Sequence, residues 1–263
     1  MIVFLLIVFG LIFGSFVNAL VWRLHEHRDW VKERSECPNC HHTLAAKDLV
    51  PVFSWLSLGG KCRYCHRPIP DSPLVELSLP ILFVVSYIYW PEPLSGAGLY
   101  SFIFWLIFLV GFVALAVYDL KWFLLPNVIV FPLIALAVVD VAGRALLFRG
   151  GWQDLLGSAV GAAIISGLFF LIYQFSRGRW IGFGDVKLAI VLGLLAGGSL
   201  PALLVLFIAS LVGTVFSLPM VVAGRASRKS HLPFGPMLII GVIVVVLFGQ
   251  AIIDWYTSFV IAV

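Results

Sequence analysis

Charge is scarce in this sequence. Only 11% of its 263 residues are Asp, Glu, Lys or Arg, whereas 62% are hydrophobic and the mean hydropathy is +1.08. Soluble globular domains carry about 25% charged residues, so the composition excludes an ordinary soluble domain. The formal net charge of +4 does not indicate a nucleic-acid partner, because basic cytoplasmic loops produce the same excess in membrane proteins.

The sequence also lacks the alternating segments of ~10 residues that form a membrane β-barrel. Its apolar runs are continuous, as in FIFWLIFLVGFVALAVY (102–118). Lipid permits only helices and closed barrels, so the fold class is predicted to be an all-α polytopic membrane protein. Runs long enough to suggest spans predict about eight transmembrane helices, at 2–22, 74–90, 99–118, 123–147, 154–175, 186–197, 200–223 and 234–259.

The first apolar run has no basic segment before it and no small-residue cleavage site after it. A secretory signal peptide is expected to have both a basic segment and a cleavage site. We therefore expect residues 1–22 to be a retained transmembrane helix.

Basic residues predict the orientation of the chain. Fifteen of the seventeen Lys and Arg residues fall in alternate loops, at 23–73, 119–122, 176–187 and 224–233, and only Arg144 and Arg149 fall in the others. Loops rich in Lys and Arg stay in the cytoplasm. The N-terminus is therefore expected outside, and the long loop and two aspartates, Asp119 and Asp185, on the cytoplasmic side.

Cysteine is absent outside the long loop, which holds all four residues as CPNC (37–40) and CRYC (62–65). Two CxxC turns present four thiolates, which suit a closed tetrahedral zinc site. Such a site is structural, and metal binding would supply folding energy to a loop with few core-forming residues. Cys37, Cys40, Cys62 and Cys65 are therefore the candidate ligands of a structural Zn²⁺.

Two other interpretations of the cysteines stay open. The pairs could form disulfides, which a reducing cytoplasm disfavours, or they could act as a redox relay. His41, His42 and His66 adjoin the cysteines and are expected to be solvated neighbours rather than ligands.

The sequence has no serine nucleophile elbow and no His-Glu-x-x-His zinc motif, but it places aspartates at the ends of apolar runs. Asp119 follows one run in VYDLKWFLLPN, and Asp185 opens another in GFGDVKL. Ionisable groups in or beside spans are costly and suggest function. Asp140 and Asp254 are expected to be structural or merely solvated, because Arg144 can pair with the first and aromatic residues flank the second.

Asp119 and Asp185 have a simpler interpretation as charges that cap helix ends, and Asp185 is a reasonable N-cap. If the two carboxylates meet, they cannot both ionise, so one keeps a proton. The ionised partner can then activate a water, and the protonated one can polarise a peptide carbonyl. Gly182 and Gly184 precede Asp185, and glycine lets an extended substrate backbone approach closely.

Several segments together resemble the prepilin peptidases, the membrane aspartic peptidases of the GxGD type that serve type IV pili and type II secretion. The resemblance covers nearly the whole chain. The segments are GSFVNALVWR (14–23), SECPNC (35–40), KDLVPVFSWLSLGGKCRYCHRPI (47–69), PLVE (73–76), Asp119 with LPN (125–127), GFGDVKL (182–188) and PFGP (233–236).

The resemblance implies a bifunctional enzyme of a prokaryotic inner membrane. It would cleave the leader peptide of type IV prepilins or pseudopilins at the cytoplasmic face with Asp119 and Asp185, then N-methylate the new N-terminus with S-adenosyl-L-methionine. The four cysteines would be the metal ligands. Glu76 would match a position tied to methyl transfer, although a carboxylate there also suits the dipole at a helix start.

The implied organisation has three parts: a first transmembrane helix (1–22), a cytoplasmic four-cysteine loop for methyl transfer (23–73) and a transmembrane peptidase core (74–263). No glycine-rich dinucleotide-type loop follows a strand in this sequence, so the site of the methyl donor would be unconventional. Two other classes of function stay open. One is a membrane thiol-disulfide oxidoreductase that uses the CxxC pairs, and the other is a proton-coupled transporter that uses the aspartates, although no internal repeat supports it.

Overall fold

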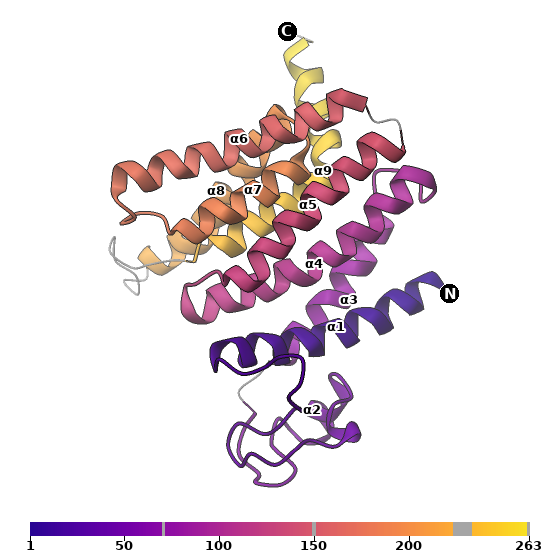
Figure 1. Ribbon diagram of the computed structural model, residues 1–263, viewed down its shortest axis with the longest axis vertical. Helices are drawn as coiled ribbons and strands as arrows, with labels where there is room; N and C mark the ends of the chain where they lie inside the picture. The colour runs from indigo at the N-terminus through magenta and orange to yellow at the C-terminus, as the bar shows by residue number, and fades with distance from the viewer. Residues whose placement is uncertain (70–71, 149–150, 223–232, 262–263) are drawn as a thin grey trace. The chain divides into compact units, whose positions relative to one another are not determined.

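The regular elements of the computed structural model are helices, and it describes residues 1–69, 72–148, 151–222 and 233–261 (Figure 1). The chain divides into two compact units. Unit 1 comprises Met1–Ile88 and Phe112–Val117, and unit 2 comprises Tyr89–Gly111 and Tyr118–Val263.

Unit 1 contains two apolar helices and a loop between them. Its elements are α1 (Ile2–His25), the short 3-10 helix η1 (Ala46–Asp48), α2 (Phe53–Ser57) and α3 (Pro73–Ile88). α1 packs closely on α3 because it carries glycine at the contact. A Cβ at Gly10 would lie 2.4 Å from Pro80 Cα, and a Cβ at Gly14 would lie 2.6 Å from Glu76 Cα. Small residues permit such close helix packing in membranes.

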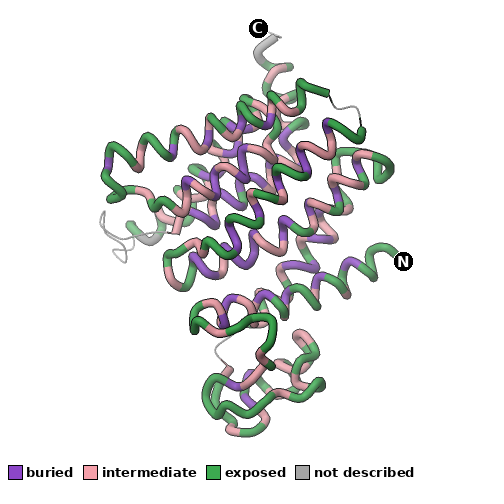
Figure 2. The backbone as a smooth tube through the Cα atoms, viewed as in Figure 1, coloured by how far each residue is buried: buried purple, intermediate pink, exposed green. Residues whose placement is uncertain are grey.

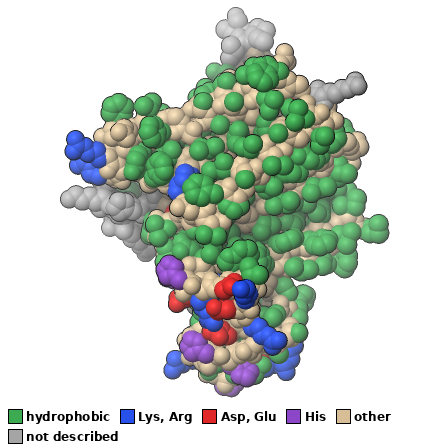
Figure 3. All heavy atoms as spheres, in the orientation of Figure 1, with side chains coloured by type: hydrophobic (Ala, Val, Ile, Leu, Met, Phe, Trp, Pro, Cys, Tyr) green, Lys and Arg blue, Asp and Glu red, His purple; other side chains and the backbone are tan. Residues whose placement is uncertain are grey.

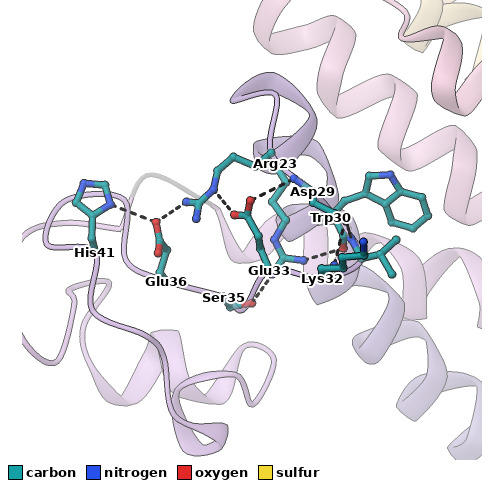
Figure 4. Close-up of polar contacts among 10 residues, drawn as sticks. Arg23, Asp29, Trp30, Lys32, Glu33, Ser35, Glu36 and His41 are labelled. Carbon is teal, nitrogen blue, oxygen red and sulfur yellow. Dashed lines mark hydrogen bonds and ion pairs between the residues drawn. The ribbon is translucent and has the colours of Figure 1, made fainter.

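The loop of unit 1 is held by polar contacts where it leaves α1. Arg23, which is buried, donates from Nη1 to the carbonyl oxygen of Trp30 at 3.0 Å and from Nη2 to Ser35 Oγ at 3.1 Å. Arg28 pairs with Glu33 and Glu36. Figure 4 shows both glutamates close to Arg23 and Ser35. The view in Figure 3 shows charged side chains and histidines gathered on this loop and hydrophobic side chains over the helices. Polar contacts therefore contribute order where apolar burial is small.

Unit 2 is a bundle of six helices, most of them connected by short turns. They are α4 (Gly96–Trp122, of which 112–117 cluster with unit 1), α5 (Asn127–Leu147), α6 (Gly151–Ser176), α7 (Phe183–Ala196), α8 (Ser199–Val222) and α9 (Gly235–Ile261).

α7 lies at the centre of this bundle. It packs against α5, α6, α8 and α9, and the side chains of Leu188, Val191 and Leu192 are fully buried. Buried residues recur along it in Figure 2. Glycine again sets the closest contact, because a Cβ at Gly193 would lie 2.4 Å from Ala162 Cα in α6. The start of α7 is therefore held from several sides.

The predicted fold class is confirmed. A helix occupies each of the eight predicted runs, and six of these helices are long and apolar enough to cross a membrane. α3, with 16 residues, and α7, with 14, are shorter. The count of eight spans stays a prediction for these two. Among the basic residues used for orientation, Arg149, Arg225, Arg228 and Lys229 lie outside the described residues.

The start of the fourth predicted span differs. We expected it at residue 123, but α5 begins at Asn127. Phe123 takes a left-handed conformation, with φ of 56°, and its N–H donates to the carbonyl oxygen of Asp119 at 2.8 Å, which ends α4. Pro126, which has no N–H to offer a helix, then precedes α5. Residues 123–126 therefore form a tight turn that directly follows the last turn of α4.

Candidate functional site

Asp119 sits in the last turn of α4 and is buried, with only 5% of its surface exposed. Its carboxylate oxygen Oδ2 accepts a hydrogen bond from the backbone N–H of Gly235 at 3.1 Å. Gly235 is the first residue of α9, where backbone N–H groups have no partner within the helix. The carboxylate of Asp119 therefore faces the positive end of another helix.

Asp185 lies in the first turn of α7, where Gly182 and not Asp185 is the N-cap. The prediction of Asp185 as an N-cap is therefore wrong by three residues. Its own N–H donates to the carbonyl oxygen of Gly182 at 3.1 Å, and its side chain is half-buried. Gly182 beside it is exposed, and a Cβ there would lie 3.4 Å from Asp185 Oδ2. The carboxylate therefore borders an open, glycine-lined approach.

The structure brings Asp119 and Asp185 into one site. The two carboxylates lie close enough to interact electrostatically. Leu125, in the turn after α4, lies near Gly184, which precedes Asp185, and near Gly235, which binds Asp119. A Cβ at Gly184 would lie 3.0 Å from Leu125 Cβ, and a Cβ at Gly235 would lie 3.5 Å from Leu125 Cδ2. The ends of α4, α7 and α9 thus meet around one leucine.

Two aromatic residues of α6 hold the glycine segments of this site. The ring of Phe169 stacks on Phe234 with centroids 5.8 Å apart. Tyr173, one turn further along α6, contacts Phe183 with centroids 5.3 Å apart. Phe234 precedes Gly235, and Phe183 precedes Gly184. One face of α6 therefore positions both segments that carry the glycines.

A polar pair joins α5 to α7 beside the aspartates. Lys187 Nζ donates a hydrogen bond to Asn127 Oδ1. The same ammonium lies 5.4 Å from the ring centroid of Phe183 and 5.5 Å from that of Phe131. Asn127 and Lys187 are sixty residues apart in the chain, and the structure shows that they are partners.

The aspartates predicted to be structural have partners of their own. Arg144 Nη2 lies 3.1 Å from Asp140 Oδ2, so the predicted ion pair is confirmed. Asp254 Oδ1 accepts a hydrogen bond from Gln250 Nε2 at 2.8 Å.

The four cysteines lie in two turns with the same backbone geometry, 25 residues apart in the chain. In the first, Cys37 N–H donates to His42 O at 3.0 Å; in the second, Cys62 N–H donates to Arg67 O at 2.9 Å. An isolated antiparallel bridge closes each turn, between Glu36 and Thr43 and between Lys61 and Pro68. The CxxC segments are thus two copies of one knuckle.

The knuckles place their sulfur atoms in one cluster. The four Sγ atoms lie within 4.8 Å of one another, and Cys37 Sγ is 3.9 Å from Cys65 Sγ. A tetrahedral site with Zn–S bonds of about 2.3 Å has sulfur atoms about 3.8 Å apart. The cysteines are free, and sulfurs from both turns gather at one point. This geometry fits a bound metal ion, and it does not favour the interpretations as two disulfides or as a redox relay.

The histidines near the cysteines lie outside the cluster of four cysteines. His41 Nδ1 lies 3.2 Å from Glu36 Oε1, and its side chain is 72% exposed. His42 packs on Tyr64 with centroids 3.7 Å apart. His66 is exposed. Among the described residues, the cluster that could hold a metal ion therefore consists of the four cysteines.

η1 is attached to the second knuckle through Asp48. Arg63 Nε donates to Asp48 Oδ1 at 2.7 Å and Tyr64 Oη donates to Oδ2 at 3.0 Å. The hydrogen bond from Arg63, the main cause, and that from Tyr64 hold the pKa of Asp48 below its usual value. The segment between the two CxxC pairs is thereby fixed to the second of the two cysteine knuckles.

Glu76 lies in the first turn of α3, where the helix dipole favours a carboxylate. Its Oε2 accepts a hydrogen bond from the N–H of Val52 at 2.6 Å. Val52 has φ of 63°, which is strained for a β-branched residue. Glu76 therefore anchors the start of α2 as well as α3, a role that the sequence did not indicate.

Glu76 also lines a cavity of unit 1, between the start of α3, the end of α1 and the loop. The walls carry two indoles and three carboxylates: Trp22, Trp55, Glu36, Asp48 and Glu76. In the described part of the chain, Trp55 Nε1 is buried with no hydrogen-bond partner. The cavity thus offers aromatic faces, acidic groups and one unused donor.

Gly235 is a site residue that the sequence analysis did not assign. It donates the hydrogen bond to Asp119, and a Cβ there would lie 2.7 Å from Asp119 Oδ2. The signal available was PFGP before an apolar run, which resembles GFGD at the start of α7. Only the packing of α9 against the end of α4 shows what this glycine contacts.

Two family models match the chain. Residues 8–90 match the model described as "Bacterial Peptidase A24 N-terminal domain", and residues 105–218 match the one described as "Type IV leader peptidase family". The first contains the four cysteines and Glu76, and the second contains Asp119 and Asp185.

Curated relatives match over almost the full length. A protein of Bacillus subtilis (strain 168) is 32% identical, covering 96% of each chain. One of Pseudomonas aeruginosa is 31% identical, covering 96% of this chain and 92% of that protein. One of Xanthomonas campestris pv. campestris is 34% identical, covering 95% and 92%. Each is named "Prepilin leader peptidase/N-methyltransferase". No solved structure gives a significant match.

Proposed function

The chain belongs to the type IV leader peptidase family, and from this premise we propose that it is a multi-pass inner-membrane enzyme that cleaves the leader peptide of prepilins or pseudopilins and N-methylates the new N-terminus. One observation supports the peptidase most directly. Asp119 and Asp185, from helices far apart in sequence, share one site in which the N–H of Gly235 binds Asp119.

The chemistry follows from a pair of carboxylates that holds one proton. The ionised carboxylate takes a proton from a water, which attacks the carbonyl carbon of the scissile peptide bond. The protonated carboxylate donates to the carbonyl oxygen, and the proton that the base took from water is later given to the leaving amine, so the pair again holds one proton. The Gly235 N–H stabilises negative charge on Asp119, so we assign the base to Asp119 and the acid to Asp185. The titration belongs to the pair as a unit.

The substrate is expected to approach past Gly182. This residue is exposed beside Asp185, whereas Gly184 faces Leu125, and a Cβ at Gly184 would lie 3.0 Å from Leu125 Cβ. The peptide bond must leave helical form to be attacked, and glycine permits close contact with an extended backbone. Gly182 would therefore let the substrate approach Asp185. Gly184 would do the same and also pack against Leu125.

Replacing Gly235 by Ala should lower leader cleavage strongly without unfolding the protein. The added Cβ would meet Asp119 Oδ2 at 2.7 Å, so the carboxylate must move and its hydrogen bond with it. Loss of one preorganised donor typically costs about 10²–10³-fold in rate. The measurement is cleavage of a purified prepilin in detergent.

Gly167→Ala in α6 is the matched control for Gly235→Ala, because a Cβ there meets nothing within 4 Å. It should cleave at the rate of the unchanged protein. Equal rates for the two variants would contradict the role of Gly235.

We propose Zn²⁺ as the ion held by Cys37, Cys40, Cys62 and Cys65. Four thiolates with sulfur spacing near that of a tetrahedral Zn–S site fit this ion. With no open coordination position the ion would stabilise the knuckles and take no part in either reaction. The cysteines would thus act on the shape of the loop and of the cavity beside it.

We propose S-adenosyl-L-methionine as the methyl donor and the cavity of unit 1 as its site. The donor carries a sulfonium cation, an aromatic base and hydrogen-bond acceptors. The cavity presents the faces of Trp22 and Trp55 and the carboxylate of Glu76, and the buried Trp55 Nε1 needs an acceptor. Indole faces and carboxylates attract cations. When bound, the donor would supply the methyl group, and these residues would hold and orient it.

Glu76→Gln should weaken binding of the methyl donor by on the order of tenfold, since a charged hydrogen bond contributes about 1.5–3 kcal/mol. Gln keeps an oxygen that can accept the Val52 N–H, so the fold should persist. Equilibrium dialysis of labelled S-adenosyl-L-methionine measures the affinity. Leader cleavage should be unchanged, and unchanged donor affinity would leave Glu76 with its anchoring role alone.

Within this proposal, residues 1–22 are the first transmembrane helix, residues 23–73 the methyl-transfer loop and residues 74–263 the peptidase core. The N-terminus lies outside, with the loop and the aspartates on the cytoplasmic side, as the positive-inside rule predicts. Labelling of single cysteines placed in a cysteine-free background of each loop, in intact cells and in inverted vesicles, tests this orientation.

One assay tests both activities. The purified protein is incubated with a prepilin and S-adenosyl-L-methionine, and the mass of the pilin is followed. Loss of the leader is expected first, then the gain of one methyl group at the new N-terminus. An intact prepilin after incubation with active, folded protein would overturn the proposed function.

A further inference from the structure

A second cavity, of about 720 Å³, lies in unit 2 and takes no part in the proposed reactions. Its walls come from residues 90–92, α4, α5, the end of α7, the start of α8, and α9. Trp105 in its wall is fourteen residues before Asp119 on α4, which corresponds to about 21 Å along the helix. The cavity is therefore at the other end of α4 from the aspartate pair.

Buried polar atoms without partners concentrate at this cavity. Five buried side-chain nitrogen or oxygen atoms have no hydrogen-bond partner among the described residues, and four belong to residues that line it: Trp90 Nε1, Ser101 Oγ, Asp140 Oδ1 and Arg144 Nε. Asp140 is 97% buried, since only 3% of it is exposed. Native proteins rarely leave buried polar groups unpaired. This concentration indicates a polar ligand that supplies both donors and acceptors.

The charges around the cavity favour a cation accompanied by one anionic group. Three carboxylates line it, those of Glu92, Asp140 and Asp254, against the single guanidinium of Arg144. Glu92 interacts electrostatically with Asp140. Trp90 and Trp105 lie with ring centroids 6.3 Å apart, and indole faces attract cations. A primary ammonium satisfies this group of carboxylates, and a phosphate suits Arg144.

The remaining walls are apolar. Phe108, Leu195 and the segment 245–247 line the cavity together with the polar residues. α4, α5 and α9 are all long and apolar enough to cross a membrane, so this cavity is lined by three candidate membrane spans. A ligand with a zwitterionic head and an apolar tail fits both kinds of wall.

We propose that this cavity binds the head group of an aminophospholipid, a primary ammonium joined to a phosphate ester. The ammonium lies among Glu92, Asp140 and Asp254 beside the indoles, and the phosphate accepts from Arg144. The acyl chains leave along the apolar wall. This site is independent of the proposed peptidase and methyl-transfer activities.

The test uses delipidated full-length protein in detergent and native mass spectrometry. The probes are dihexanoyl phosphatidylethanolamine, the matching phosphatidylglycerol and free phosphoethanolamine. One phosphatidylethanolamine should bind per chain, on the order of tenfold more tightly than phosphatidylglycerol, because only the former offers charged donors to the carboxylates. The double variant Glu92→Gln/Asp254→Asn should lose this preference.

Asp154→Asn is the matched control, since Asp154 is exposed in the first turn of α6 and does not line the cavity. It should keep the preference. The proposal is overturned if the two lipids bind equally to the unchanged protein, or if the double variant discriminates as well as the control. Equal affinity for free phosphoethanolamine would overturn the lipid assignment, because the tails would then contribute nothing.

Discussion

Asp119→Asn and Asp185→Asn are each expected to abolish leader cleavage, with a loss of roughly 10²–10⁴-fold, the range of general acid–base catalysis. An amide can neither take a proton from water nor donate one to a leaving amine. Asp119→Asn therefore removes the proposed base, and Asp185→Asn removes the proposed acid. The purified variants in detergent are compared for release of the leader from a prepilin.

The structure supplies a matched control for this experiment. Asp154→Asn removes an exposed carboxylate of the same bundle, at the start of α6, and should leave cleavage unchanged. Metal content should stay at the level of the unchanged protein in all three variants, because the cysteine cluster belongs to unit 1. Cleavage near the normal rate by either Asp119→Asn or Asp185→Asn would remove that residue from the mechanism.

A single change of a buried cysteine is expected to have the largest effect on the loop. Cys62→Ser removes one of four thiolates from a cluster whose sulfurs lie within 4.8 Å of one another. Structural Zn²⁺ contributes about 10–16 kcal/mol to the folding of zinc-finger peptides. The variant should lose most of its metal, measured by elemental analysis. Residues 26–72 should become sensitive to protease while unit 2 stays protected.

His66→Asn controls for the change at Cys62. His66 is exposed in the same knuckle and has φ of 56°, a conformation that Asn tolerates. Metal content and protease resistance should be retained. Methyl-donor binding should fall in Cys62→Ser and persist in His66→Asn, because the knuckles shape the wall of the unit 1 cavity. A metal-free loop that resists protease would contradict the structural role of the ion.

The composition and the length of the apolar runs were sufficient to predict the helices. Continuous apolar segments of span length indicate a membrane environment, in which such segments form helices. Each of the eight predicted runs contains a helix. The knuckles could also be predicted from short-range sequence, because two CxxC turns flanked by Gly and Pro need only a few neighbouring residues to form. Boundaries were less exact. The helix of the fourth run begins at Asn127 and not at residue 123, because residues 123–126 form a turn that hydropathy does not detect.

The site itself depends on contacts between distant segments. The sequence identified Asp119 and Asp185 as candidates, but an equally simple interpretation placed both at helix ends with no common function. Their meeting requires the end of α4 and the start of α7 to pack around Leu125, with Phe169 and Tyr173 of α6 holding the glycine segments. Gly235 could not be assigned to Asp119 without that packing, and Glu76 could not be assigned to the N–H of Val52.

The sequence by itself determined that this protein is a helical membrane protein with a four-cysteine loop, because hydrophobicity and short-range spacing are properties of single segments. The tertiary structure decided which of its polar groups lie together: the two carboxylates with a helix N-terminus, the four sulfurs from two turns, and, among the described residues, the unpaired polar groups around the cavity of unit 2. The physical reason is that hydrogen bonds and unscreened charge interactions act over a few ångströms. Only packing brings residues separated by tens of positions within that distance.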